Sequence, residues 1–536
     1  MIKQKSRTRR RTPAVDRSPN DAGPIGNRIA DLMLHSLDAA ADRVEALNTR
    51  VAKQLRAKPR KVKGKRTKNA AVLLLGLLYV GTACQAQTEF PNTPAGNQAK
   101  VWLDSFNTGD AEKHKEFLRK NAPTRLERVD REMALREMSG GFDVKKVEES
   151  APTKLAALVQ ERASDQFVRF TIEVDASEQH QITKLTLQGI ARPPEFALPH
   201  LSESELITSL RKKLDEAAAG DRFSGAALVA RNGKTVFAQA YGLADREKKI
   251  PNTLKTRFRL GSMNKMFTAV ATLQLVQSGK LDLKAPFGKY LTDYPNKDAA
   301  SKVTIEQLLS HTGGTGDIFG PEFDKNRLEL QTLQDYVKLY GNRAPEFEPG
   351  SRWAYSNYGF LLLGVLIEKV TGQSYYDYVR DHIYKPAGMT GTASEPEEQT
   401  VAERSIGYTR FTGGGLKPNT ETLPYRGTSA GGGYSTVEDL LKFATALQTH
   451  KLLNAQYTEM LTTGRVDTPG GKYAYGFGDA IINGMRCFGH GGGAPGMNGE
   501  LKICPGAGYV VAVLANTDPP AASRVADFIT NRLPAK

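Results

Sequence analysis

The sequence predicts a mixed fold of the α+β or α/β class, divided into a small domain and a larger unit. In residues 91–200, helical segments come first and strand-like runs follow, which is typical of a small α+β domain. From about residue 205 onward, strand-like segments stand at both ends and helical segments fill the middle. This order predicts an antiparallel sheet that is built from both termini of the unit, with a helical domain beside it.

The N-terminal 68 residues carry most of the positive charge of the chain. Residues 1–68 hold 19 Lys and Arg against 6 Asp and Glu, whereas the remaining residues hold 55 against 52. The rest of the chain is therefore nearly neutral, which argues against nucleic acid as a partner. We interpret 1–68 either as a basic tail or as sequence that precedes the true start, which would then lie near Val62.

An apolar run follows this basic segment. "AAVLLLGLLYVGTAC" is shorter than the roughly 20 residues that span a bilayer. Basic residues, an apolar stretch and then small residues are typical of a secretory signal, which we place at 69–86. Cys84 is a candidate lipidation site because "GTAC" resembles a bacterial lipoprotein box, and plain cleavage after Ala86 is the alternative. We expect an exported protein, periplasmic or membrane-anchored in a bacterium, that contacts the membrane only through residues 69–84.

The small domain is expected at residues 91–195. "AKVWLDSFNTGDAEKHKEFLRKNA" predicts helical structure interrupted by a turn at Asn107–Asp110. "TKLAALVQERA", "QFVRFTIEVDA" and "ITKLTLQGIA" predict strands through their β-branched residues and partial alternation. Through its "FNTGD" turn the domain resembles the cone-shaped NTF2-like domains. It contains no Cys/His cluster, and we expect an accessory role, followed by a linker at 196–206.

The larger unit is expected at residues 207–536. It opens with a helix, "ELITSLRKKLDEAAAG", and a hairpin, "FSGAALVARNGKTVFAQAYG", whose turn is Asn232-Gly233. "GYVVAVLAN" predicts a C-terminal strand, and "SRVADFITNRL" predicts a last helix. These end segments supply the predicted sheet.

One helix of the middle part carries a lysine at an unexpected place. "FRLGSMNKMFTAVATLQLVQSG" predicts a helix from near Ser262 to a stop at Gly279, apolar nearly all round and therefore buried. Ser262 and Lys265 nevertheless share one face of it. Burial favours a neutral lysine amine, which could take the proton that a serine must lose to act as a nucleophile. The helix N-terminus also favours a developing negative charge at Ser262.

Tyr355 and Asn357 form a second candidate motif. They stand in "PGSRWAYSNYGFLLLGVLIEKVTG", just before an apolar helix predicted at 358–370. A phenol and an amide at a helix start can point into one cleft. The alternative is that Asn357 simply caps the helix.

The third candidate motif is glycine-rich. In "RCFGHGGGAPGMNGELKIC", His490 stands at the end of a predicted strand and three glycines follow it. Backbone without side chains lets a substrate approach closely and leaves N–H groups free for an oxyanion, although a hairpin loop would explain the same glycines. Cys487 and Cys504 flank the segment, so that two paired strands could join them in a disulfide. Two buried free thiols are the alternative.

Together, Ser-x-x-Lys, Tyr-x-Asn and His-x-Gly in this order resemble the serine β-lactamase and penicillin-binding-protein superfamily. Further matches are "LLSHTGG", "PGSRWAYSN", "SAGGGYSTVEDLLKF" and "VLANTDPP". They place the resemblance nearest to the branch of class C β-lactamases, D,D-carboxypeptidases and esterases, over nearly all of residues 205–533. The resemblance implies a β-lactamase-like fold, and we expect neither a cofactor nor a metal.

The resemblance also implies an acyl-enzyme mechanism. Ser262 would attack a carbonyl, Lys265 and Tyr355 would share the task of general base, and Tyr355 would protonate the leaving group. The residues implied in substrate binding are Asn357, His490 and Gly492. The oxyanion hole would be the backbone N–H groups of Ser262 and Gly493, and His311 in "SHTGG" would brace the cleft.

One departure from the family pattern concerns the substrate. Gly491 stands where β-lactamases usually carry the threonine of Lys-Thr-Gly, so the hydroxyl that helps to hold a carboxylate is missing. We expect a monomeric, exported serine hydrolase for a small ester or a D-amino-acid peptide, with β-lactams as the least favoured substrate. One alternative is a penicillin-recognising sensor or pseudoenzyme that binds or acylates without turnover. Another places the function in an interaction module at 91–195.

Overall fold

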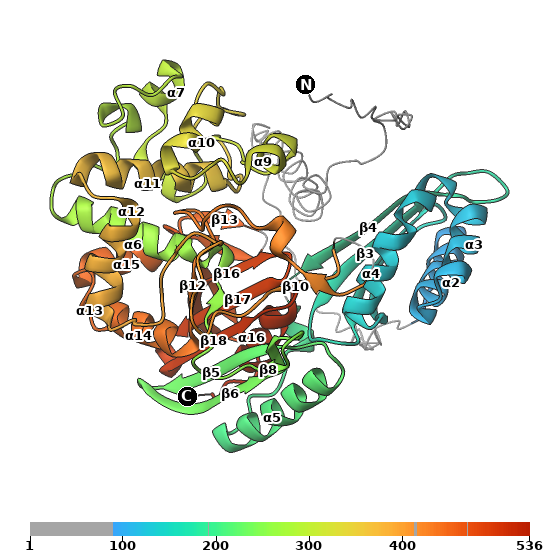
Figure 1. Cartoon of the computed structure of the whole chain (residues 1–536). Helices are drawn as coiled ribbons and strands as arrows, with labels where there is room; N and C mark the ends of the chain where they lie inside the picture. The colour runs from blue at the N-terminus through green and yellow to red at the C-terminus, as the bar shows by residue number, and fades with distance from the viewer. Residues whose placement is uncertain (1–88, 191, 412–414, 469, 536) are drawn as a thin grey trace, which may run out of the picture.

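The computed structural model divides into an N-terminal α+β domain and a larger unit around a central sheet (Figure 1). The structure describes residues 89–190, 192–411, 415–468 and 470–535. The predicted tail 1–68, the predicted signal 69–86 and Cys84 lie outside these described residues. Across the described ranges, no helix combines the length and the apolarity needed to cross a bilayer.

In the N-terminal domain, helices pack against a four-stranded antiparallel sheet of order β1-β2-β3-β4. Its elements are α2 (Pro94–Thr108), α3 (Ala111–Asn121), α4 (Val129–Ser139), β1 (Phe142–Ser150), β2 (Lys154–Glu161), β3 (Phe167–Val174) and β4 (Ile182–Ile190). Trp102 and Phe106 of α2 stack on Phe170 and Phe142 of the sheet, which gives the domain a core of its own.

Helices α2 and α3 and three of the strands of this domain lie where the sequence predicts them, whereas helix α4 was not predicted. Asp110 in the predicted turn accepts hydrogen bonds from the backbone N–H groups that begin α3, so a side-chain cap starts the second helix there. The first strand, β1, was not predicted, because its alternation is obscured by lysines and glutamates. The resemblance of the domain to NTF2-like proteins stays a prediction.

The central sheet of the larger unit has the order β13-β14-β15-β16-β17-β18-β5-β6. Its strands are β5 (Gly225–Arg231), β6 (Lys234–Tyr241), β13 (Val466–Thr468), β14 (Gly471–Tyr473), β15 (Gly478–Ile482), β16 (Met485–Ala494), β17 (Met497–Cys504) and β18 (Tyr509–Ala515). The C-terminal strand β18 pairs with β5, so the sheet is built from both termini, as predicted. Asn232 and Gly233 make the predicted turn, both with positive φ (49° and 76°).

Alternation along the strands divides the unit into two cores. Ala227 and Val229 of β5 pack with α5 (Glu203–Ala219) and α16 (Ala521–Thr530), whereas Leu228 faces the helical layer. The helices of that layer are α6 (Asn264–Gln277), α7 (Lys297–Lys302), α8 (Ile305–Leu309), α9 (Pro321–Asn326), α10 (Leu333–Tyr340), α11 (Asn357–Thr371), α12 (Tyr375–Val379), α13 (Lys385–Ala387), α14 (Val437–Gln448) and α15 (Ala455–Thr462). The sheet therefore lies between two helical layers, and the predicted β-lactamase-like architecture is confirmed.

Short strands complete the unit outside the central sheet. They are β7 (Leu243–Asp245), β8 (Ile250–Pro251), β9 (Phe258–Arg259), β10 (Tyr408–Thr409), β11 (Lys417–Pro418) and β12 (Tyr434–Ser435). Strand β9 directly precedes the turn that carries Ser262, and it pairs with β12, which directly precedes α14.

The predicted linker 196–206 is partly wrong, because α5 already begins at Glu203. Ser202 accepts a hydrogen bond from the backbone N–H of Glu205, and the Glu205 carboxylate accepts one from the backbone N–H of Ser202. This reciprocal capping box satisfies two backbone donors at the helix start, so the helix begins earlier than the predicted end of the linker.

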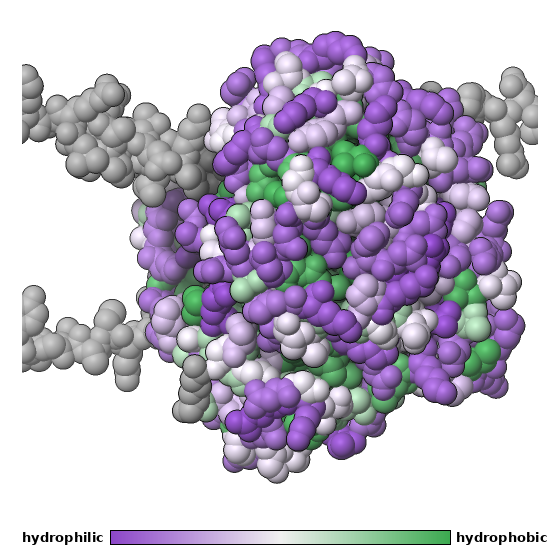
Figure 2. Space-filling view, turned by 90° about the vertical axis from the view of Figure 1, so that its left-hand side faces the viewer, coloured by the Kyte–Doolittle hydropathy of each residue, from purple (hydrophilic) through white to green (hydrophobic). Residues whose placement is uncertain are grey.

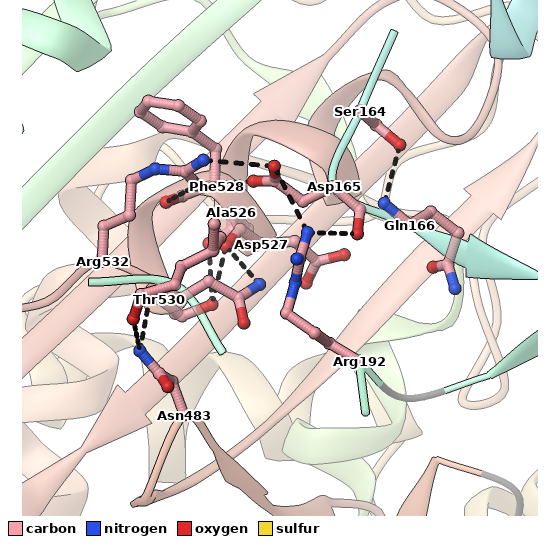
Figure 3. Close-up of polar contacts among 12 residues, drawn as sticks. Ser164, Asp165, Gln166, Arg192, Asn483, Ala526, Asp527, Phe528, Thr530 and Arg532 are labelled. Carbon is pink, nitrogen blue, oxygen red and sulfur yellow. Dashed lines mark hydrogen bonds and ion pairs between the residues drawn. The ribbon is translucent and has the colours of Figure 1, made fainter. Parts of the chain in front are cut away.

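The N-terminal domain contacts the C-terminal helix of the larger unit through charged side chains (Figure 3). Asp165, in the loop between β2 and β3, accepts a hydrogen bond of 3.1 Å from Arg532, just beyond α16. Arg192 donates to the backbone carbonyl of Asp165 at 2.8 Å, and Arg524 of α16 pairs with Glu161 at 2.8 Å. These contacts fix α16 against one end of the smaller sheet.

The face of the molecule drawn in Figure 2 is mainly polar. Figure 2 shows hydrophilic residues over most of one face, with hydrophobic residues in small patches. Large apolar side chains that are exposed among the described residues are Val101, Ile250, Phe319, Leu328 and Ile481. Single exposed apolar residues of this kind are normal for a soluble surface and indicate no partner by themselves.

Candidate active site

The predicted Ser-x-x-Lys motif lies between the sheet and the helical layer. Ser262 occupies a single helical turn, Gly261–Met263, that leads into α6, and Lys265 follows in the first turn of α6. Lys265 Nζ lies 3.3 Å from Ser262 Oγ. The Lys265 side chain is fully buried, whereas Ser262 is partly exposed. A substrate can therefore reach the serine but not the lysine.

The surroundings of Lys265 define how its amine can act. Nζ lies 2.7 Å from Asn357 Oδ1 and 2.6 Å from the backbone oxygen of Ala430, and both of these oxygens can only accept hydrogen bonds. Burial lowers the pKa of Lys265 to about 7, against the opposing charge of Asp317. A neutral amine that donates its two N–H groups to these oxygens keeps its lone pair for the third neighbour, Ser262. The geometry is suited to proton transfer from the serine to the lysine.

Tyr355 and Asn357 complete this side of the site. Asn357 is the first residue of α11, and the helix is capped by Ser356, whose Oγ accepts the backbone N–H of Gly359 at 2.9 Å. The alternative that Asn357 caps the helix is therefore wrong, and its amide is free to face Lys265. Burial raises the pKa of Tyr355, against a hydrogen bond with Ser262 that lowers it, so the phenol keeps its proton at neutral pH.

The glycines after His490 lie in a strand, which corrects the alternative of a hairpin loop. Strand β16 extends to Ala494, and β15 pairs with it only as far as Gly489. The open edge beyond that point faces the turn that carries Ser262. A Cβ atom on Gly492 would stand 1.9 Å from the backbone oxygen of Leu260, so this close approach requires glycine.

The same approach brings together the two backbone groups predicted for an oxyanion hole. A Cβ atom on Gly261 would stand 2.9 Å from the backbone nitrogen of Gly493, and one on Gly492 would stand 3.0 Å from that of Ser262. The nitrogens of Gly493 and Ser262 therefore lie on the two sides of one narrow contact. Backbone N–H groups held in this way can stabilise a developing oxyanion without reorganising.

His490 is held by a chain of hydrogen bonds that begins at α11. The backbone N–H of Ser356 donates to His311 Nδ1 at 3.1 Å, which leaves the proton of this imidazole on Nε2. His311 Nε2–H then donates to Tyr473 Oη at 3.1 Å, and Tyr473 O–H donates to His490 Nε2 at 3.0 Å. Burial and the charge of Lys265 lower the pKa of His311 far below its usual range and that of His490 to about 3, so both imidazoles are neutral.

Sequence reasoning missed three groups of the site. Tyr473 stands in "GKYAYGFG", where only its position between two glycines marks it. The backbone oxygen of Ala430 belongs to "SAGGGYS", which the resemblance includes but to which it assigns no role. Asp317, six residues after His311, contacts Asn357 and has no local signal in the sequence.

The two remaining cysteines lie behind this part of the sheet. Cys487 of β16 and Cys504 of β17 are joined in a disulfide, so they are not free thiols. The pair is buried in the core formed with α5 and α16, on the face opposite the helical layer. The bond links the two strands next to the segment that carries His490 and the glycines.

Solved structures with the same fold are named for penicillin binding and for amide hydrolysis. A penicillin-binding protein from Bacillus halodurans is 33% identical, with a TM-score of 0.54 over 58% of this chain and 98% of its own. A D-stereospecific amidohydrolase from Streptomyces sp. is 29% identical, with a TM-score of 0.52 over 60% of this chain and 97% of its own. Both matches show that this chain shares the fold of these proteins.

A curated relative and a family model agree with this fold. The teichoic acid D-alanine hydrolase of Staphylococcus aureus is 29% identical over 270 residues, which make up 50% of this chain and 65% of that protein. The chain thus spans less than two thirds of the length of this relative. Residues 210–536 match the model of the family described as Beta-lactamase. This match covers more than half of the chain and contains all the site residues above, and the protein belongs to the β-lactamase family of serine hydrolases.

Proposed function

We propose that the protein is a hydrolase that forms an acyl-enzyme at Ser262 and releases the acyl group to water. The observation that carries this proposal is the arrangement around Lys265 Nζ, which has two acceptors close by and Ser262 Oγ at 3.3 Å as its third neighbour. A base held in this way can activate a serine hydroxyl at neutral pH.

The residues act in a defined order in this reaction. Ser262 Oγ attacks the carbonyl carbon while its proton passes to Lys265 Nζ, and the carbonyl oxygen becomes an oxyanion beside the backbone N–H groups of Ser262 and Gly493. When the intermediate collapses, the leaving group takes the phenol proton of Tyr355, which recovers a proton from Lys265. Water then attacks the acyl-enzyme by the same steps and restores the serine.

We favour a D-amino acid ester or amide as the substrate over a β-lactam. Two proteins of similar sequence are named as a D-stereospecific amidohydrolase and as a teichoic acid D-alanine hydrolase. In this chain, Gly491 supplies no side-chain hydroxyl at the position where β-lactamases use a threonine to help hold a substrate carboxylate. The neighbouring carboxylate of Glu500 is turned toward α16, where it accepts a hydrogen bond of 3.1 Å from Ser523 Oγ.

The test is intact-mass spectrometry of the purified full chain with D-alanine p-nitrophenyl ester or with benzylpenicillin, beside Ser262→Ala. We expect the wild type to release nitrophenol over many turnovers and Ser262→Ala to form no adduct. A lasting penicilloyl adduct without turnover would support the alternative of a penicillin-recognising sensor. Acylation that persists in Ser262→Ala would contradict the proposed nucleophile.

We further propose that the protein is exported through the signal at 69–86 and acts as a monomer. A disulfide between Cys487 and Cys504 fits an oxidising compartment. Fractionation of cells that express the full chain, with Cys84→Ala as the control for lipidation, tests the location. Sedimentation of the purified protein tests the oligomeric state.

A further inference from the structure

Asp317 contacts the site although it belongs to none of the motifs. It lies in the loop between α8 and α9, where its carboxylate accepts hydrogen bonds from Asn357 Nδ2 at 2.9 Å to Oδ1 and 3.2 Å to Oδ2. The backbone N–H of Ile318 donates to the same Oδ1 at 2.7 Å. The carboxylate is therefore held in place and faces the amide that contacts Lys265.

A carboxylate in this position determines which way the Asn357 amide points. Burial raises the pKa of this carboxyl, whereas hydrogen bonds from Asn357 and from the backbone N–H of Ile318 lower it. In its ionised form the carboxylate only accepts hydrogen bonds, so it binds the NH2 end of the amide and turns the oxygen away. That oxygen then faces Lys265 Nζ at 2.7 Å. With the amide reversed, the NH2 group of Asn357 would face Lys265 Nζ as a donor. The lysine lone pair would then accept from that NH2 group instead of pointing at Ser262.

The charge of Asp317 also acts on Lys265. The other titratable groups that face the amine are His311 from the same loop, Tyr355 before α11 and His490 on β16, and all three are neutral. Among the described residues around the amine, Asp317 is thus the group that favours the ammonium form, whereas burial favours the neutral form.

We propose that Asp317 is a positioning residue of this site, which orients the Asn357 amide so that Lys265 can take the proton of Ser262. This inference rests on the proposed function, because it concerns the step in which Ser262 is acylated. Asp317 does not touch the reacting atoms and acts only through Asn357 and through its charge.

Asp317→Asn tests the proposal, because it keeps the shape and removes the charge. An asparagine can accept or donate toward Asn357, so the orientation of the amide is no longer enforced, and we expect the acylation rate at high pH to fall about tenfold. Loss of the negative charge lowers the pKa of Lys265, so the neutral amine persists at lower pH. In the pH profile of the acylation rate, the acid limb should therefore shift to lower pH by about one unit or more.

The matched control is Glu346→Gln. This exposed carboxylate lies on a neighbouring loop beside Gly316. Its removal should change neither the acylation rate at high pH nor the position of the acid limb in the pH profile. Asp317→Ser serves as a second variant in case the asparagine variant does not fold, which circular dichroism would show. The readout is the rate of nitrophenol release from D-alanine p-nitrophenyl ester between pH 5 and 9.

Two results would overturn the inference. An unmoved acid limb in a folded Asp317→Asn or Asp317→Ser variant would show that the charge does not act on Lys265. A rate at high pH equal to that of the wild type in both variants would show that the amide needs no fixed orientation. By contrast, a wild type that is not acylated at any pH would refute the proposed function itself.

Discussion

At Lys265, burial and the charge of Asp317 act on the pKa of one amine in opposite directions. Burial lowers its pKa to about 7, so that the neutral form and the ammonium form both exist near neutral pH. The neutral form is the base, and its fraction falls tenfold for each pH unit below the pKa. We therefore expect the acylation rate to rise with pH up to about 7 and then to level off, in nitrophenol-release assays from pH 5 to 9. A rate that is flat or falls as pH rises over this range would contradict the role of Lys265.

Tyr473 is the second residue at which the site can be tested. Its hydroxyl bridges the buried imidazole of His311 and the partly exposed imidazole of His490, so Tyr473→Phe leaves a donor and an acceptor without a partner. We expect the free energy of unfolding to fall by about 1–3 kcal/mol, because buried polar groups that lose their partner cost roughly this much. We also expect kcat/KM to fall, because the His490 side chain loses the hydrogen bond from Tyr473 that fixes its orientation.

Tyr475→Phe is the matched control for this change. Tyr475 is also buried and stands two residues away, but its hydroxyl bonds to Glu306, outside the site. It should lose stability in thermal denaturation while its kcat/KM stays close to that of the wild type. Equal losses of kcat/KM in both variants would show that Tyr473 acts only through stability.

At the scale of elements, strand β16 and the turn before α6 meet through backbone alone. Gly492→Ala would place a Cβ atom 1.9 Å from the backbone oxygen of Leu260, so the strand and the turn must move apart. We expect the two N–H groups of the predicted oxyanion hole to separate and the acylation rate to fall by about 100-fold or more, the cost of losing one such donor. Stopped-flow acylation measures this directly.

Gly478→Ala controls for the substitution itself. Gly478 lies in the neighbouring strand β15, where an added Cβ atom would stand 3.7 Å from its nearest neighbour, the backbone oxygen of Gly489. This is ordinary contact, and acylation by this variant should remain within about twofold of the wild type. A Gly492→Ala variant that matches it would show that β16 and the turn can separate without cost.

The two ends of the sheet and the helix after Ser262 could be predicted from periodicity and local spacing, and the site residues from the resemblance that the three motifs carry. The contacts of Asp317, Tyr473 and Ala430 could not, because each comes from a loop whose place depends on packing between distant segments. For the same reason, the cap of α11 could be assigned to Ser356 and not to Asn357 only with the structure.

At the scale of the whole molecule, the two folded parts have separate cores. They meet through charged side chains on α16 and just beyond it, and through the pair of Arg410 and Glu137. Every site group described above comes from the larger unit, and none comes from residues 89–190. The contact between the parts includes Asp165 and Arg532, whose side chains are only 15% and 16% exposed. Removing one partner of a pair this well shielded leaves the other charge uncompensated and therefore costs more stability than the same change on the open surface.

Arg532→Ala should loosen this contact without changing the chemistry. Asp165 would lose its partner beyond α16, and we expect the junction to weaken by about 2 kcal/mol, as for the loss of a hydrogen bond to a charged group. Limited proteolysis should then cut faster in the segment 192–202, while the acylation rate stays within about twofold. Arg380→Ala, which removes an exposed arginine paired with Asp377 and Asp381, should leave the proteolysis rate unchanged. If Arg532→Ala slowed acylation by the same factor by which it accelerated proteolysis, the N-terminal domain would have to support the site directly. Its role could then no longer be described as accessory.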